Sequence, residues 1–454
     1  MTDIARRDLL AAAGALAAWG GSPSPAPGAA AAPVRRLEYD VVVAGGGTAG
    51  TAAAVAAARR GHKVLLVEEA NCLGGTSTSG GVCEWFANLE GMGDVFDRVR
   101  NDLNKHGAVL KGRFFNAEYL KIAWQLLAQE AGVTVLLHAS AVGVSADPGR
   151  VKALRIVSCS QPIEAEAKFF IDATGEGDVA AAAGAEFMKG DPAHGRTLHM
   201  TLTFVLYDTG KPVQPHLPAG LEEIKSNRDL PGLGMGYVLG DGRVYFNATK
   251  VMLHDPTDPL SLSDAELEAR RQLARIVHYA QRTKYPNHAL CSSGARIGIR
   301  EGRRIVGDYV LSEDDILKGA ARTFSDGVAV ATSQIDFHSL TRPGSGGWRQ
   351  QVDPYAIPYR CLLVKGLANV LTAGKCISGD QVAHSSYRMT PTCCGMGQAA
   401  GTAAAIAVEA RRRDLREVDV KALRAELAKA GVELDPGKHK SFAPSRHSGR
   451  KEAD

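Results

Sequence analysis

The strongest pattern in the sequence is an apolar run that leads directly into a glycine-rich turn. Residues 39–44 read YDVVVA, the kind of strand that is buried on both faces of a parallel sheet. The turn 45–50, GGGTAG, opens an alanine-rich stretch, 51–60, that predicts a helix, and a second apolar strand follows at 63–67. The pattern therefore predicts a βαβ unit of about thirty residues, with Glu68 at the end of its second strand.

The spacing of glycines in this turn is typical of a dinucleotide-binding site. Gly45 permits the tight turn, Gly47 lets the backbone approach a pyrophosphate, and Gly50 lets the helix pack close to the strand. The helix N-terminus offers free N–H groups and the positive end of a dipole to the phosphates. An acidic residue at the end of the second strand can accept hydrogen bonds from the adenosine ribose. The predicted cofactor contacts here are Gly45, Gly47, Thr48, Ala49, Gly50, Glu68 and Glu69.

A second glycine-rich loop, LGGTSTSGG at 73–81, directly follows the predicted ribose-binding strand. With it, the sequence resembles FAD-dependent oxidoreductases of the glutathione-reductase-like flavoprotein superfamily. The resemblance implies that FAD is the cofactor and that this loop passes its pyrophosphate and isoalloxazine edge, with contacts from Gly74, Gly75 and Thr76. A flexible surface loop is the alternative.

Two further blocks carry the same resemblance. The strands predicted within 133–158 lead to FFIDATGEGD at 169–178, whose Ala-Thr-Gly turn is a hallmark of these flavoproteins. The block 367–378 resembles their last strand, and GMGQAAG at 395–401 opens a helix to about residue 412, whose N-terminus is expected to face the flavin N1/C2=O edge. The resemblance adds as cofactor contacts Ala141, Thr174, Gly175, Asp178, Gly374 and Gly397.

The segment 191–350 has a different pattern, with extended stretches and a helix predicted after a capping box at 263–266. No second G-x-G-x-x-G occurs there, so a separate NAD(P)H domain is not expected. The predicted fold is α/β: a Rossmann-like FAD-binding domain, made of a parallel sheet with a β-meander, plus an inserted mixed α+β substrate or cap domain. The expected divisions are a signal peptide (1–32), the FAD-binding domain's N-terminal part (37–190) and C-terminal return (351–415), the cap (191–350), and a C-terminal helix with a basic disordered tail (416–454).

The first thirty-two residues predict export. Arg6 and Arg7 precede an apolar run at 9–19 and four alanines at 29–32, an arrangement that resembles a twin-arginine signal. A membrane-spanning helix needs about twenty apolar residues, so we expect no permanent membrane anchor and a periplasmic or otherwise exported protein. A chance arginine pair before an alanine-rich linker stays open.

Charge and cysteine content narrow the possible partners. The sequence has 53 Lys and Arg against 49 Asp and Glu, and its C-terminal tail is basic. The near-neutral remainder lacks the basic stripe of a nucleic-acid-binding protein, so no nucleic-acid partner is expected. The eight cysteines form no C-x2-C pairs, and no metal site is expected. Redox activity of Cys393 and Cys394, or covalent attachment of FAD through Cys72, stays open.

The segment 379–388, GDQVAHSSYR, is predicted to form a loop that the fold holds beside the isoalloxazine. His384 is a candidate general base, since histidine titrates near neutral pH. Arg388 is a candidate clamp for a carboxylate or an oxyanion. The alternatives are that His384 only packs against the loop and that Arg388 pairs with a structural acid.

Two more groups of polar residues are candidates for the substrate site. In IDFH, 335–338, we expect Asp336 and His338 to point to opposite faces of a strand, with His338 as the substrate contact or as a satisfied core histidine. Arg296 and Arg300 are candidates for binding an anionic substrate. On a helix, their block, 296–309, would instead form a salt-bridged face, and this second interpretation is favoured.

These observations together indicate an exported FAD-dependent oxidoreductase of the dehydrogenase or oxidase type. It would transfer a hydride between a small organic substrate and flavin N5, with His384 or His338 managing the proton and an unidentified electron acceptor completing the cycle. The alternatives are an FAD-dependent monooxygenase and a flavin-binding electron-transfer subunit without its own substrate. The sequence does not name the substrate, the direction of the reaction or the oligomeric state.

Overall fold

A computed structural model of the chain describes residues 33–232, 236–341 and 347–442. The predicted signal peptide, 1–32, and most of the predicted basic tail lie outside the described residues. Within the described part of the chain, no helix combines the length and the apolar character that crossing a membrane requires.

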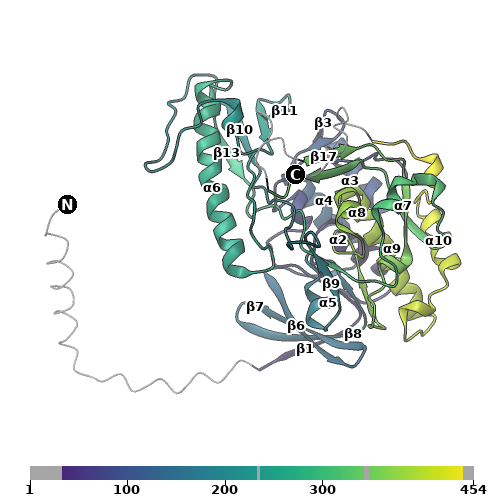
Figure 1. Ribbon diagram of the computed structural model, residues 1–454. Coiled ribbons are helices and arrows are strands. Elements are labelled where there is room, and N and C mark those ends of the chain that lie inside the picture. Colours follow the sequence, from purple (N-terminus) through teal and green to yellow (C-terminus); the bar gives the residue numbers. More distant parts are fainter. Residues whose placement is uncertain (1–32, 233–235, 342–346, 443–454) are drawn as a thin grey trace, which may run out of the picture.

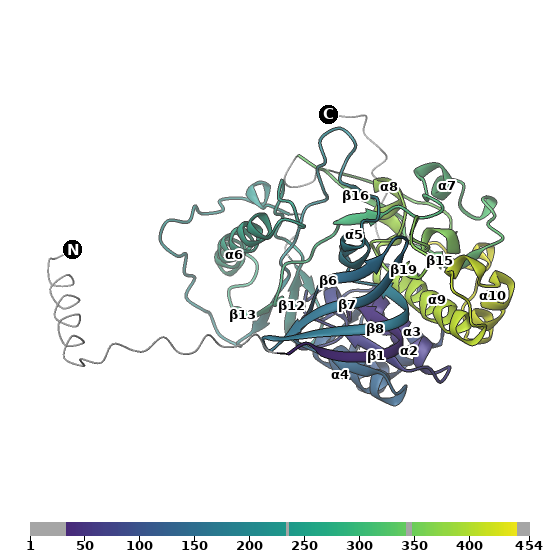
Figure 2. The ribbon, with the colours of Figure 1, turned by 90° about the horizontal axis from the view of Figure 1, so that it is seen from below.

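A seven-stranded mixed sheet belongs to the larger part of the molecule, and its strands β1, β6, β7 and β8 lie at the lower edge of the view in Figure 1. Its strand order is β5-β2-β1-β8-β7-β6, and β19 also pairs with β8. The pairs among β5, β2, β1, β8 and β19 are parallel, whereas β6, β7 and β8 form an antiparallel meander; Figure 2 shows β6, β7, β8 and β1 side by side. The strands are β1 (Arg35–Ala44), β2 (Val64–Val67), β5 (Thr134–Leu136), β6 (Ala139–Asp147), β7 (Arg150–Ser158), β8 (Gln161–Asp172) and β19 (Val370–Thr372).

Strand β8 explains how the C-terminal part of the chain rejoins this sheet. The first part of β8, Gln161 to Glu166, pairs with β7, whereas its last three residues pair with β19. Along its other edge, β8 pairs with β1. The predicted fold class, with a parallel sheet, a meander and a C-terminal return, is therefore confirmed.

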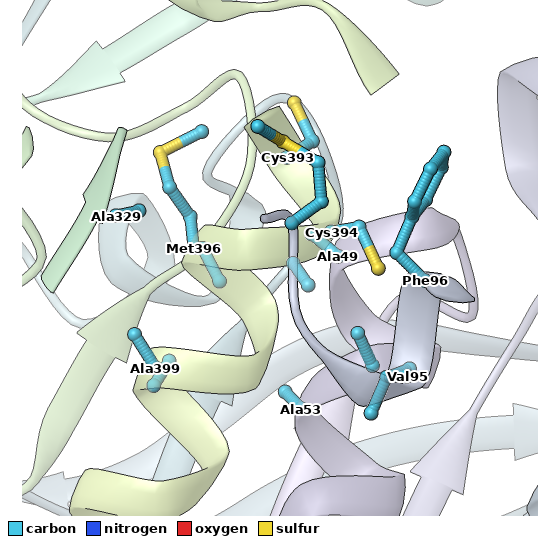
Figure 3. Packing of buried hydrophobic residues seen from close by; sticks show 14 of the residues in the cluster. Ala49, Ala53, Val95, Phe96, Ala329, Cys393, Cys394, Met396 and Ala399 are labelled. Carbon is cyan, nitrogen blue, oxygen red and sulfur yellow. The ribbon is translucent and has the colours of Figure 1, made fainter. Parts of the chain in front are cut away.

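The helices beside the sheet pack through alanine and glycine. A Cβ atom added to Gly397 or Gly401 of α9 would lie 2.0 Å from the carbonyl oxygen of Ala49 or Ala53 in α2. Only glycine therefore permits this close approach of the two helices, which Figure 3 shows around Ala49, Ala53 and Ala399. The helices of this region are α2 (Thr48–Ala58), α3 (Asp94–Lys105), α4 (Ala117–Glu130), α5 (Asp178–Ala182), α9 (Thr390–Glu409) and α10 (Val420–Lys429).

The middle of the chain builds a second layer with its own core. The antiparallel strands β11 (Tyr237–Val238), β12 (Arg243–Phe246), β10 (Phe204–Asp208) and β13 (His288–Ser293) form a sheet beside helix α6 (Pro259–Arg282), as Figure 1 shows. Buried residues of α6, including Leu273 and Ile276, belong to this core. The predicted capping box at 263–266 was wrong, because Asp258 caps the helix by accepting from Ser261 N at 2.7 Å. Ser263 lies inside the helix, where its hydroxyl donates back to the Pro259 carbonyl.

The remaining elements of the described chain are short. They are β3 (Val109–Leu110), β4 (Phe114–Phe115), β9 (Phe187–Lys189), β14 (Arg303–Ile305), β15 (Gly327–Ala331), β16 (Ile335–His338), β17 (Gly347–Gln350), β18 (Tyr355–Pro358), α7 (Glu313–Leu317) and α8 (Gln381–Tyr387). The predicted loop at 379–388 is largely helix α8, because Asp380 caps its first turn by accepting from Ala383 N at 2.7 Å.

Candidate cofactor cavity and active site

A cavity of about 410 Å³ lies at the carboxyl ends of the parallel strands. The turns that follow β1, β2, β8 and β19 all contribute to its lining, as expected for a ligand site in an open parallel sheet. All but two of the cofactor contacts predicted from the sequence line it: Gly45, Gly47, Thr48, Ala49, Glu68, Glu69, Gly74, Gly75, Thr76, Ala141, Thr174, Gly175, Asp178 and Gly374.

The two exceptions, Gly50 and Gly397, lie where helices pack and are not part of the lining. A Cβ atom on Gly50 would lie 1.7 Å from the Gly45 carbonyl oxygen, and one on Gly397 would lie 2.0 Å from that of Ala49. For Gly50 this is the predicted packing role. For Gly397 it corrects the expectation of a direct contact, because the residue serves the α2–α9 packing.

Two helix N-termini open onto the cavity without a side-chain cap. Helix α2 begins after Gly47, and α9 begins after Met389, five residues earlier than the sequence indicated. Thr390 in the first turn of α9 lines the cavity, and its buried hydroxyl has no hydrogen-bond partner among the described residues. Free N–H groups and the positive ends of two helix dipoles therefore favour an anionic or electron-rich ligand here.

Glu68 presents a buried carboxylate to the same cavity. Its Oε2 accepts from Gly46 N at 2.6 Å, and its Oε1 accepts from Ala70 N at 2.7 Å. Burial raises the pKa of Glu68, and the two backbone hydrogen bonds oppose that shift. The backbone thus fixes the carboxylate at the end of β2, in the position predicted for a ribose acceptor.

Sequence reasoning missed several residues of the lining. Lys375 forms an ion pair with Glu176 and donates to the Gly175 carbonyl at 2.9 Å. It directly follows Gly374, so the turn already singled out could have indicated it. Arg296, which the sequence offered as a candidate for binding an anionic substrate, also lines the cavity and forms an ion pair with Glu69, which joins the middle of the chain to the end of β2.

The block 296–309 does not form the expected salt-bridged helix. It contains the short strand β14, and its arginines find separate partners. Arg303 pairs with Asp178 at 2.8 Å, and Arg304 pairs with Glu301. Arg300 instead donates to the neutral acceptors His199 O, Thr201 Oγ1 and Asn247 Oδ1.

The structure places His384 away from the cavity lining. Its side chain is fully buried in α8, and neither ring nitrogen has a hydrogen-bond partner among the described residues. Burial holds the pKa of His384 well below its ordinary value. The geometry therefore matches the packing alternative, and the expectation that His384 serves as a general base beside the isoalloxazine is corrected.

Asp336 and His338 form a hydrogen-bonded pair on β16. His338 Nε2 lies 3.0 Å from Asp336 Oδ2, and Arg349 Nε donates to Asp336 Oδ1 at 2.7 Å. The prediction that Asp336 and His338 point to opposite faces was wrong, because residues two apart on a strand share a face.

Arg388 connects this pair to the cavity. It lies at the C-terminal end of α8, lines the cavity, and its Nη2 donates to both Asp336 O and Asp336 Oδ2 at 3.3 Å. Although burial alone raises the pKa of Asp336, His338, Arg388 and Arg349 hold it well below its usual range. Burial lowers the pKa of His338 to about 4, despite the opposing effect of Asp336. The pair is thus a carboxylate next to a neutral imidazole at neutral pH.

The buried vicinal cysteines of α9 do not form a disulfide. Cys393 and Cys394 are both free thiols and project to different sides of the helix in Figure 3. Burial raises the pKa of both thiols, that of Cys393 to about 12. Neither group is therefore a thiolate at neutral pH.

Comparison with known families identifies the class of protein. Residues 40–427 match the family model described as FAD dependent oxidoreductase. The chain belongs to this family. It is an FAD-dependent oxidoreductase, as the sequence indicated, and the comparison with curated proteins found no match.

Several solved structures resemble this oxidoreductase at a distance. A geranylgeranyl bacteriochlorophyll reductase-like protein from Thermoplasma acidophilum has 12% identity and a TM-score of 0.45, over 90% of this chain and 94% of that one. The myxobacterial chondrochloren halogenase CndH has 12% identity and a TM-score of 0.43, over 87% and 79%. The anhydrotetracycline hydroxylase OxyS from Streptomyces rimosus has 14% identity and a TM-score of 0.39, over 88% and 70%. These likenesses are too distant to inform the chemistry of the site.

The residues of the cavity fit FAD. Gly47 leaves open space, since a Cβ atom there would meet only Gly75 Cα, at 4.0 Å. That space, with the uncapped N-terminus of α2, suits a pyrophosphate, and Glu68 suits the ribose. The N-terminus of α9, with the unpartnered Thr390 hydroxyl, suits the polar edge of a flavin ring. A cavity of about 410 Å³ is within the usual range of about 300–1,000 Å³ for ligand pockets.

Proposed function

We propose that this FAD-dependent oxidoreductase oxidises a small organic substrate by hydride transfer, with His338 accepting the accompanying proton. The observation that carries the proposal is the Asp336–His338 hydrogen bond of 3.0 Å beside Arg388, which itself lines the cofactor cavity. FAD, when bound, supplies the acceptor for the hydride. The substrate C–H bond breaks with its electron pair, and the hydroxyl or amine proton of the substrate passes to the imidazole.

The hydrogen bond to Asp336 decides which nitrogen of His338 can accept that proton. Because a carboxylate only accepts hydrogen bonds, His338 Nε2 carries the hydrogen in the neutral ring. The lone pair then lies on Nδ1, which is the basic atom. Asp336 also stabilises the imidazolium that forms when the proton arrives, in the manner of an acid that orients a catalytic base.

The proposal is tested by mixing the purified flavoprotein, without oxygen, with hydroxy acids, amino acids, alcohols and amines. Loss of the visible absorbance of the flavin with any of these compounds, slowed strongly by His338→Ala, is the expected result. Bleaching by NADPH alone would overturn the proposal in favour of a monooxygenase. Bleaching only by a reduced protein would favour an electron-transfer subunit.

We also propose that the protein is exported through its N-terminal segment. The support is the pair Arg6 and Arg7 ahead of the apolar run 9–19. Replacing both arginines by lysine keeps the charge and removes the arginine pair. Retention of that variant in the cytoplasm of a bacterial host that exports the parent chain is the expected result, and equal export of both would overturn the proposal.

A further inference from the structure

Arg300 differs from the other arginines of its block, because its guanidinium donates hydrogen bonds to neutral acceptors. Its Nη1 donates to His199 O at 3.1 Å and to Thr201 Oγ1 at 2.5 Å, and its Nη2 donates to Asn247 Oδ1 at 3.3 Å. Among the described residues, no carboxylate forms an ion pair with it, although the other arginines of its block each have one. Burial lowers the pKa of Arg300 to about 10, so that it is still cationic at neutral pH.

The groups around Arg300 leave an excess of positive charge. Asp336 is the carboxylate at this site, and Arg349 and Arg388 already share it, at 2.7 and 3.3 Å. Two further carboxylates act on these groups, and both are already paired: Glu84 with Arg113 at 3.1 Å, and Glu301 with Arg304. A buried charge without a counter-charge is costly, so a ligand that brings negative charge would be stabilised here.

Unused hydrogen-bonding groups gather at the same place. His199 lies with its ring centroid 4.5 Å from that of His338, and its buried Nδ1 has no partner among the described residues. The same holds for Arg388 Nε and for the fully buried hydroxyl of Tyr245, whose pKa burial raises. Native proteins leave few buried polar groups unpaired, which indicates that a ligand completes these hydrogen bonds.

From these observations we propose that Arg300 and Arg388 bind a carboxylate group of the substrate, with His199 and Tyr245 completing its hydrogen bonds. The inference rests on the proposed function, because it assigns a substrate class to the site that contains His338. A carboxylate suits two guanidinium groups, whose N–H donors match its two oxygens. The substrate class is then a small hydroxy or amino acid, whose C–H bond is oxidised while its carboxylate stays bound.

The test measures binding to the FAD-loaded protein by calorimetry, with acetate, glycolate and malonate as probes and their amides as uncharged counterparts. We expect the carboxylates to bind and the amides to bind at least about tenfold more weakly. Arg300→Gln is expected to weaken carboxylate binding by about tenfold or more and to leave amide binding unchanged. Arg322→Gln is the matched control, because Arg322 pairs with Asp315 at 2.9 Å outside this site.

The possible results either support or overturn carboxylate binding by Arg300 and Arg388. Equal binding of carboxylates and amides, or carboxylate binding by Arg300→Gln as tight as in the parent protein, would overturn it. If Arg300→Gln fails to fold, Arg300→Lys takes its place, because lysine keeps the positive charge but lacks the planar set of N–H donors. A carboxylate affinity between those of the parent protein and of a protein without the site supports the proposal. An affinity equal to that of the parent protein contradicts it. Bleaching of the flavin by alcohols or amines without preference for acids would overturn the inference alone. Carboxylate binding without bleaching by any compound would overturn the proposed hydride transfer alone.

Discussion

The cofactor cavity and the cluster around Asp336 are built in opposite ways. The cavity is lined largely by glycine, alanine, serine and threonine, and it offers backbone N–H groups at two helix N-termini. The Asp336 cluster consists of ionisable side chains, His199, Arg300, His338, Arg349 and Arg388, which lie far apart in the sequence. Local backbone geometry therefore dictates the first site, and tertiary contacts between charged groups assemble the second.

Because the two sites are built differently, we expect substitutions to affect different properties at each of them. At the turn and helix glycines that build the cavity, such as Gly45 and Gly397, an added methyl group meets backbone atoms that cannot move. The cost of such a substitution therefore falls on folding and cofactor binding. In the cluster, a lost side chain removes a charge or a proton acceptor, so the cost falls on turnover and substrate binding. The following predictions test that separation, beginning with the largest expected effect.

Replacing His338 by alanine should lower the turnover number by about a hundredfold to ten-thousandfold, the usual effect of losing a general base. FAD content should stay at the parental level, since His338 does not line the cofactor cavity. Steady-state kinetics and the flavin absorbance of the purified variant measure the two effects. His384→Leu is the matched control, with an expected turnover number near that of the parent, and a loss there equal to that of His338→Ala would show that His384 is the base.

At Gly397 in α9, a substitution is expected to lower the stability of the fold rather than the turnover number. Alanine there should destabilise the fold by about 3 kcal/mol or more, because its Cβ would lie 2.0 Å from the Ala49 carbonyl oxygen. Gly395→Ala, two residues away, is the control: its Cβ would make only ordinary contacts at 3.7 and 3.9 Å, and it should raise stability by up to about 1 kcal/mol. Denaturant unfolding of both variants measures the free energy of unfolding. Equal values would show that the α2–α9 contact is less tight than the structure indicates.

The same separation explains what the sequence could predict. The order strand, glycine turn, helix, strand and acid is local: Gly45 adopts a φ of 94° at the turn, and a Cβ on Gly50 would meet the Gly45 carbonyl oxygen at 1.7 Å. The cavity lining around Gly45, Gly74 and Thr174 was therefore visible from spacing and resemblance. Gly397 was assigned to the wrong role because its partner, Ala49, lies almost 350 residues earlier in the chain.

The charged cluster was only partly predictable, because its signal exists only after folding. Nothing in the spacing of Arg300 shows that it lacks an acidic partner, since on a helix the acids of its block would have neutralised it. His199 lies in a stretch without a motif and was missed. His384 was chosen for its residue type and its nearness to the last strand, but the cap at Asp380 folds α8 and buries it.

A smaller effect is expected from Glu68→Gln. The amide keeps the size of the side chain, but its NH₂ group faces one of the two backbone N–H donors, Gly46 N or Ala70 N. We expect the dissociation constant for FAD to rise by about tenfold, with turnover of the FAD-saturated enzyme nearly unchanged. Titration of the apoprotein with FAD measures the constant. Glu69→Gln is the control, since Glu69 is half exposed and pairs with Arg296, and a shift as large as that of Glu68→Gln would argue against a ribose acceptor at Glu68.

The smallest effect concerns pH, and it distinguishes the buried His338 from an ordinary surface histidine. The pKa of His338 is lowered to about 4, so the ring gains its proton, and loses its capacity as a base, only as the pH falls through about 4. Between pH 7 and pH 5, kcat/KM should then fall by only about a tenth, whereas a base with the ordinary histidine pKa of about 6.5 would lose about twenty-fivefold. The loss is measured as the pH profile of kcat/KM, with a substrate that does not change its ionisation state over this pH range.

Asp336→Asn should lower turnover strongly, but the acidic midpoint of the pH profile should not rise toward pH 6.5. The reason is that burial depresses the pKa of His338, whereas Asp336 opposes that depression. If kcat/KM of the parent enzyme fell with a midpoint near pH 6.5, the proton would be taken by a group in contact with solvent, outside the Asp336 cluster.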